Sequence, residues 1–298
     1  MPNKMKNAEK KVVRKKHRGQ GAEIWARFCK NKGAMIGMAI VIMLLLLALF
    51  ADVIFDYDTQ IAGRNAKERL LPPSWEHPFG TDNMGRDLFC RVLYGTKYSF
   101  LIGVAATALS TLIAVPLGAS AGYFGGTLEE VVMRFIDVLS SIPPILMGIV
   151  VVSALGASME NLIIAIGITG ITGKTRMTRA AVLTVKNQEY VEAARVVGMR
   201  EWGIILKHIL PNCLSPIIVS VTLGIASAVV SASSLSFLGM GVPVPSPEWG
   251  ALLSDGRTYI RTASHLTLFP GLAILVTVLA FNLMGDGLRD ALDPKLRK

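Results

Sequence analysis

The chain has 298 residues, of which 52% are hydrophobic and 17% are charged, with a formal net charge of +10. A soluble protein of this length carries about a quarter charged residues, spread along all of its amphipathic elements. Here the charges are crowded into a few zones and are absent from whole segments. This composition excludes an ordinary soluble globular protein and indicates a membrane protein.

Six segments are apolar enough to cross a bilayer, which takes about 20 apolar residues in a helix. In chain order they are 33–51, 98–121, 133–155, 161–181, 213–238 and 266–283. None alternates in polarity as barrel strands do, and a backbone in lipid must satisfy its own hydrogen bonds. We therefore predict an all-α fold, a polytopic membrane helix bundle with six transmembrane helices.

Prolines and glycines within these spans predict local features of the bundle. Pro116 and the Pro143-Pro144 pair are expected to kink the second and third spans. Gly118, Gly122 and Gly126 have small-xxx-small spacing, which lets helix backbones approach closely in lipid. Packing within this chain and packing against a partner subunit explain that spacing equally well.

The placement of cations predicts the orientation of the chain. Residues 1–32 hold eleven Lys or Arg residues against two acids, and cations next to a span favour the cytoplasm. An even number of spans then places both termini in the cytoplasm, together with the basic segment 174–207. The basic tail lies beside a spanning helix, so anionic membrane lipid is its expected neighbour and nucleic acid is not expected.

The sequence contains few patterns typical of catalytic, nucleotide-binding or metal-binding sites. The stretch 167–175 ends like a phosphate-binding loop, but Ile168 stands where that motif requires glycine, and the stretch follows an apolar helix rather than a strand. Lys174 is interpreted instead as a cytoplasmic anchor, and Arg134 with Asp137 as an interfacial ion pair one turn apart. The cysteines and histidines are scattered without metal-ligand spacing. No catalytic residue, metal site or cofactor is therefore expected in this chain.

The cytoplasmic segment between the fourth and fifth spans has a distinctive pattern. Glu192-Ala193-Ala194 is followed by Gly198 and then by Leu210-Pro211. This pattern resembles the coupling loop of bacterial ABC importer permeases. Two alanines make a thin helix face that can enter a groove on another protein, and Gly198 permits the turn into a second short helix. Pro211 would then reset the chain into the fifth span.

Blocks outside this loop narrow the resemblance to one subfamily and extend it over almost the whole chain. They resemble the second permease subunit of peptide and nickel importers. The outer loop contributes His77, Gly80, Thr81, Asp82, Gly85, Arg86 and Asp87. The other blocks are 235–241, 247–250, 281–290 and 292–294.

This resemblance implies a type I ABC importer permease fold, in a bacterial cell membrane, that works without catalytic chemistry of its own. The implied partners are a homologous second permease, two cytoplasmic ABC ATPases that hold ATP and Mg, and an extracytoplasmic substrate-binding protein. The implied organisation of the chain is a basic cytoplasmic tail (1–32), a first transmembrane helix (33–55), an extracytoplasmic loop (56–97), a five-helix permease core (98–288) with the coupling loop at 187–211, and a cytoplasmic tail (289–298).

The family leaves the cargo open among di- and oligopeptides, nickel chelates and metallophores, and its breadth favours peptides. Two other functions compete with a permease. An ATP-independent secondary carrier needs ionisable residues inside its spans, and here the span interiors read as free of charge. A membrane scaffold that recruits a soluble partner does not need six spans. Neither alternative explains the family blocks.

Overall fold

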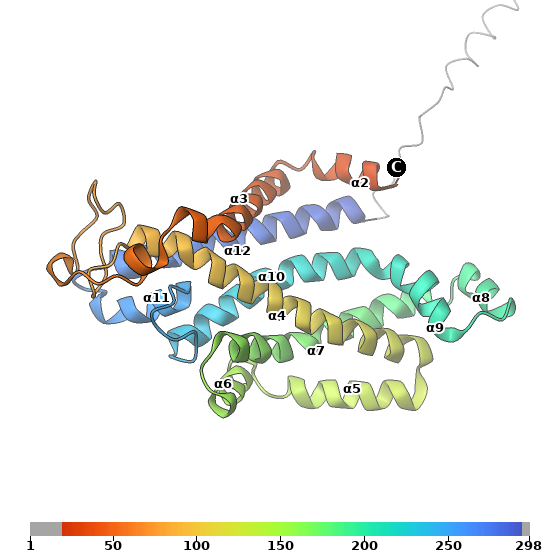
Figure 1. The fold of residues 1–298 in the computed structure, drawn as a ribbon. Helices are drawn as coiled ribbons and strands as arrows, with labels where there is room; N and C mark the ends of the chain where they lie inside the picture. Colours follow the sequence, from red (N-terminus) through yellow and green to blue (C-terminus); the bar gives the residue numbers. More distant parts are fainter. Residues whose placement is uncertain (1–19, 294–298) are drawn as a thin grey trace, which may run out of the picture.

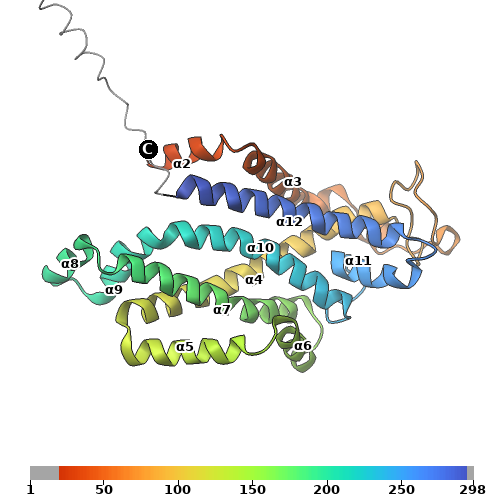
Figure 2. The ribbon, with the colours of Figure 1, turned by 180° about the vertical axis from the view of Figure 1, so that it is seen from behind.

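In the computed structural model, residues 20–293 are described, and they form a bundle of helices. Within that range no strand is present, and the one bridge outside helices pairs Thr81 with Asp87. The long helices run roughly along one direction and join two ends of an elongated molecule (Figures 1 and 2). Most of the predicted basic tail, residues 1–19, and the end of the C-terminal tail, residues 294–298, lie outside the described residues. The all-α expectation is confirmed.

The two ends of the described chain pack together. Helix α2 (Gln20–Phe28) is followed by α3 (Lys32–Ile54), which begins where the Asn31 side chain accepts a hydrogen bond from the amide of Ala34 at 3.2 Å. Helix α3 lies along the last helix, α12 (His265–Leu292), in both views of the bundle (Figures 1 and 2). Helix α12 continues beyond the predicted end of the core at residue 288.

The centre of the bundle is formed by α4 (Leu88–Phe124), α7 (Met159–Val185) and α10 (Leu214–Phe237). Helix α4 begins well before the predicted residue 98 and continues through Pro116 without interruption. Packing inside this chain explains Gly118 and Gly122, because a Cβ on them would lie 2.5 Å and 3.0 Å from carbonyl oxygens of α7, whereas a Cβ on Gly126 would meet nothing within 4 Å. Helix α4 ends at Gly125, whose φ of +68° few other residues adopt.

The third predicted span is not one helix. Helix α5 (Gly126–Ser140) and helix α6 (Pro144–Leu155) are bent by 86° at the break between them. Pro143 precedes the first residue of α6, and a residue before proline is disfavoured in helical conformation, which explains why the helix stops there. The proline pair therefore breaks this segment rather than merely kinking it.

By length and composition, four helical runs in the described chain can cross a membrane, and the bent α5–α6 pair would make a fifth. The four are α3, α4, the run Glu201–Phe237 and α12. Helix α7 is long enough, but its second half carries Lys174, Arg176 and Arg179. The predicted count of six is thus not confirmed by apolar length alone, although a polytopic membrane bundle is.

Short elements cover the two ends of the bundle. At one end the chain forms α8 (Glu189–Val196), α9 (Glu201–Ile204), and the helical turns Ile205–Ile209 and Leu210–Cys213. At the other end lie the turns Tyr57–Ile61, Ala66–Glu68 and Arg257–Tyr259 and helix α11 (Trp249–Gly256). Figure 1 places α2 and the end of α12 at the same end of the molecule as α8 and α9.

Candidate functional site

Helix α8 is mounted on the bundle by one face and exposed on the other. Val191 is fully buried, in a cluster that also contains Ile204 and Ile205 from the following turns. Glu192 and Ala193 are exposed, whereas Ala194 packs against that cluster. The two alanines of the predicted motif therefore differ, because Ala193 faces outward and Ala194 lies against the body of the protein.

Gly198 ends α8 in a hydrogen-bonded arrangement of the Schellman type. The φ of Gly198 is +81°. The amide of Gly198 donates to the carbonyl of Arg195 at 3.0 Å, and the amide of Met199 donates to the carbonyl of Ala194 at 3.1 Å. A Cβ at this position would meet nothing within 4 Å. Gly198 therefore permits the turn through its left-handed backbone conformation and not through its small size.

The segment that follows is clamped to the end of α4. The Tyr123 hydroxyl donates a hydrogen bond to the Glu201 carboxylate, and the Arg195 guanidinium lies 5.5 Å from the centre of the Tyr123 ring. The rings of Phe124 and Trp202 meet edge to face, with centroids 5.7 Å apart. The sequence did not indicate this clamp, because its partners are far apart along the chain.

Leu210 and Pro211 lie in a continuous run of helical turns rather than at a chain reversal. Leu210 packs against the buried cluster under α8, and Pro211 occupies the first turn of Leu210–Cys213, where a missing amide is tolerated. The chain remains helical from Glu201 to Phe237. Pro211 therefore does not reverse the chain, and α9 is connected directly to α10 by helical turns.

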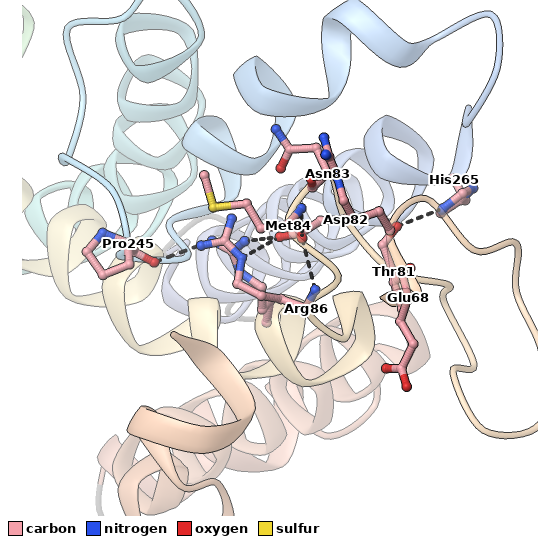
Figure 3. Close-up of polar contacts among 10 residues, drawn as sticks. Glu68, Thr81, Asp82, Asn83, Met84, Arg86, Pro245 and His265 are labelled. Carbon is pink, nitrogen blue, oxygen red and sulfur yellow. Dashed lines mark hydrogen bonds and ion pairs between the residues drawn. The ribbon is translucent and has the colours of Figure 1, made fainter. Parts of the chain in front are cut away.

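At the opposite end, the outer-loop residues form a buried polar network around Asp82 (Figure 3). One Asp82 oxygen accepts from the amides of Met84 and Arg86 at 2.8 and 3.0 Å, and the other accepts from Arg86 Nε at 2.6 Å and from Arg91 Nη1. Arg91 also donates to the carbonyl of Pro245 at 3.3 Å. The network thus ties the outer loop to the start of α4 and to the loop before α11.

The remaining signature residues shape the same loop. Thr81 is buried, and its hydroxyl bonds the carbonyl of Glu68 and accepts from the Leu71 amide. Asp87 caps α4 by accepting from the Cys90 amide at 3.0 Å, and its other oxygen is 2.8 Å from His77 Nδ1. This part of the chain therefore holds the loop together and does not present a row of exposed contact residues.

Two glycines permit this tight fold. Gly80 and Gly85 have φ values of +76° and +77°, in the left-handed region. A Cβ on Gly85 would lie 1.8 Å from the carbonyl oxygen of Asn65, and one on Gly80 would lie 2.6 Å from the carbonyl oxygen of Leu71. Neither position can accept a side chain without moving the backbone.

The electrostatics of this loop are set by two buried guanidiniums. Burial raises the pKa of Asp82, but the Arg91 and Arg86 guanidiniums and two backbone amides outweigh it, so its pKa lies below the ordinary value. Glu248, within the block 247–250, is fully buried and caps α11 through the amides of Gly250 and Ala251 at 2.9 Å. Burial raises the pKa of Glu248.

The main cavity of the described chain, about 830 Å³, lies between α4, α7 and α10. Its wall is rich in small polar side chains, among them Ser110, Thr169 and Ser227, and it includes Lys174. The Lys174 ammonium bonds the Ser110 hydroxyl. Lys174 therefore does not stand free on the surface of α7, because it lies at a cavity and contacts α4.

The other cations of α7 have partners on α5. Arg176 Nη2 is 2.8 Å from Asp137 Oδ1, and Arg179 Nε donates to Glu129 at 2.6 Å. The predicted pair of Arg134 with Asp137 is wrong, since Asp137 pairs across helices instead. These contacts attach the amphipathic helix α5 to the charged half of α7.

Comparisons with known proteins decide the family. Residues 114–298 match the family described as the binding-protein-dependent transport system inner membrane component, and residues 19–73 match the N-terminal transmembrane domain of oligopeptide transport permease C. The chain belongs to this family of importer permeases. The expectation from the sequence blocks is confirmed.

Curated relatives of this permease span nearly its whole length. It is 42% identical to the dipeptide transport system permease protein DppC of Haemophilus influenzae, over 93% of this chain and 95% of that protein. It is 44% identical to the glutathione transport system permease protein GsiD of Escherichia coli, over 92% of this chain and 90% of that protein.

A solved structure supports the fold of the permease. Its match to a chain of the inward-facing MetNI methionine ABC transporter has a TM-score of 0.57 at 17% identity, over 68% of this chain and 97% of that chain. At this identity the likeness concerns the fold alone. The fold is that of a type I ABC importer permease.

Proposed function

We propose that this permease is the second membrane subunit of an ATP-driven importer of di- or oligopeptides. The named relatives support a peptide cargo, since they are described as dipeptide and glutathione permeases. Nickel chelates and metallophores are not favoured by any of these relatives. The chain itself would carry out no catalysis, and ATP with Mg would be held by partner ATPases.

The observation that carries this proposal is the mounting of α8. Its outer face exposes Glu192 and Ala193, and the adjoining Val196 and Val197 are 87% and 86% exposed. Apolar side chains this exposed at the end of a short helix fit insertion into a groove on a partner. Its Arg195 lies over the ring of Tyr123 on α4, and Glu201 of the following helix, α9, accepts a hydrogen bond from the hydroxyl of that tyrosine. A push on α8 would therefore reach α4 and α10 as rigid-body motion.

Each residue of the predicted motif has a role in this proposal. Glu192 makes a polar contact with the ATPase, and exposed Ala193 lets the helix enter the groove. Ala194 and Leu210 hold the segment against the bundle, and Gly198 sets the turn between α8 and α9. Pro211 lies in the helical connection into α10.

For the topology, we infer that α7 is the sixth crossing and that both termini are cytoplasmic. Helix α7 connects the outer end of α6 to α8 along the bundle (Figures 1 and 2). The described ends of the chain lie at the end of the molecule that carries α8, where the ATPases would bind. The charged half of α7 is compatible with a crossing because it pairs with α5 and lines a cavity.

The remaining partners are a homologous permease subunit and a substrate-binding protein on the outer side. The loop network around Asp82 would serve the second of these by giving the outer surface a fixed shape. Trp75 is fully exposed at this end of the molecule. An exposed large aromatic side chain on a rigid loop suits a protein contact.

Affinity purification of this chain from its native membrane in mild detergent tests the assembly. We expect a second permease and P-loop ATPases to be recovered with it. Glu192→Lys is the matched variant, because it changes an exposed residue and should release the ATPases while the second permease remains bound. A chain that is recovered alone, and stays alone after crosslinking, would contradict the proposal.

A further inference from the structure

Lys174 differs from the other cations in the described part of α7. Arg176 and Arg179 pair with carboxylates on α5, whereas the one described contact of the Lys174 ammonium is the hydroxyl of Ser110. Counting back from Val185 at 1.5 Å per residue, Lys174 lies about 16 Å from the end of the helix. It is half-buried between helices, about three turns before the end of α7.

Gly224 leaves room for the side chain of Lys174, and a polar side chain, that of Thr107, lies close to the same glycine. A Cβ on Gly224 of α10 would lie 3.4 Å from Lys174 Nζ and 3.3 Å from the methyl group of Thr107 on α4. Thr107 is 2% exposed, and its hydroxyl has no hydrogen-bond partner in the described residues. Lys174, Ser110 and Thr107 all line the cavity.

The ammonium of Lys174 on α7 and the hydroxyl of Thr107 on α4 are donors suited to a carboxylate. The Ser110 hydroxyl, also on α4, donates to the Thr107 carbonyl at 2.9 Å and can turn its proton to a ligand instead. Charged side chains within spans are costly and face the bundle interior or a water-filled cavity. The other charged residues on this wall, Arg289 and Asp293, come from the end of α12. The cavity between α4, α7 and α10 therefore has a concentrated positive charge at Lys174.

We propose that Lys174, with Ser110 and Thr107, forms a subsite that holds a carboxylate of the peptide as it passes through the permease. This inference rests on the proposed function, because it assumes that the cavity belongs to the peptide pathway. The carboxylate comes from the peptide C-terminus or from an acidic side chain. In either case the same donors receive it.

The test is ATP-driven peptide uptake by proteoliposomes containing the complete importer, supplied with saturating loaded binding protein. Lys174→Met removes the charge and keeps the length, and Lys174→Arg retains the charge. We expect Lys174→Met to reduce uptake of a tripeptide by about tenfold, as for loss of one charge-assisted hydrogen bond. Lys174→Arg should retain most of the uptake. Loss of the C-terminal contact would slow a neutral and a Glu-containing tripeptide alike, whereas loss of a side-chain contact would slow the second alone.

A charge-restoring variant separates binding from a structural role. Lys174→Cys, treated with an aminoethyl thiosulfonate, regains a positive charge and should regain uptake, whereas a neutral methyl adduct should not. Treated wild-type importer controls for the native cysteines. Uptake of both tripeptides by Lys174→Met at the wild-type rate, or equal recovery with the neutral adduct, would overturn the inference. Absence of uptake by the wild-type importer would instead contradict the proposed function.

Discussion

The hydroxyl of Tyr123, at the end of α4, hydrogen-bonds the carboxylate of Glu201 at the start of α9. This contact joins a membrane helix to the segment that is proposed to receive the ATPase. The Arg195 guanidinium over the Tyr123 ring adds a residue from α8 to the same junction. Movement of α8 would therefore displace α4 through this junction. It would also displace α10, because α9 and α10 belong to one continuous helical run.

Tyr123→Phe should weaken this transmission without unfolding the protein. A hydrogen bond to a charged group contributes about 1.5–3 kcal/mol, and loss of part of it loosens the junction. We expect fewer peptides to be imported per ATP hydrolysed, while ATP hydrolysis continues. Tyr259→Phe, at the other end of the molecule, is the control. An unchanged ratio of peptide to ATP in Tyr123→Phe would show that the clamp is not part of coupling.

Gly198→Val should abolish uptake while the protein remains in the membrane. Valine in a left-handed conformation costs about 1–2 kcal/mol, and the chain would leave the Schellman geometry and reorient α9. Gly198→Asn should keep much of the activity, because asparagine tolerates this conformation. Membrane-fraction blots with uptake assays measure both. Gly21→Val, at an open helical position, controls for added bulk. Normal uptake by Gly198→Val would contradict this account.

Asp82→Asn should destabilise the outer loop strongly. It leaves the buried guanidiniums of Arg86 and Arg91 without their carboxylate, and breaking a buried ion pair in this way costs about 3–5 kcal/mol. Thermal unfolding of the purified importer in detergent should show a clear fall in transition temperature. Asp58→Asn, at an exposed residue, should have little effect. Equal transition temperatures for the two variants would show that the network contributes no stability.

The carboxylate of Asp82 should also make the stability of the protein fall at acid pH. Since the pKa of Asp82 is lower when folded than the value of about 3.9 when unfolded, its contribution to stability is complete above that pH. It is lost as the pH falls through the folded pKa. The difference in stability between wild type and Asp82→Asn should therefore be constant from neutral pH to about pH 5 and shrink below about pH 4. A difference that grows in acid would contradict the charged state of Asp82.

Local sequence features predicted much of the fold. Long apolar runs identified α3, α4, α10 and α12 because lipid imposes length and polarity on a spanning helix. The family blocks located the loops at both ends. Gly198 was recognised as a turn residue, although its physical reason is a positive φ and not small size.

What the sequence did not reveal depends on contacts between distant residues. Asp137 was matched with its neighbour Arg134, but the helix packing brings Arg176 closer. Lys174 was interpreted as an anchor at the end of a span, because the sequence alone does not show that this residue lines a cavity. The Tyr123–Glu201 contact joins residues 78 positions apart, which no local pattern can signal.

The most direct test of the central claim is peptide uptake by proteoliposomes containing this chain with its second permease, its ATPases and its binding protein. We expect uptake that requires both ATP and loaded binding protein and that is lost in Gly198→Val. Uptake at the same rate without ATP, driven by an ion gradient alone, would contradict it.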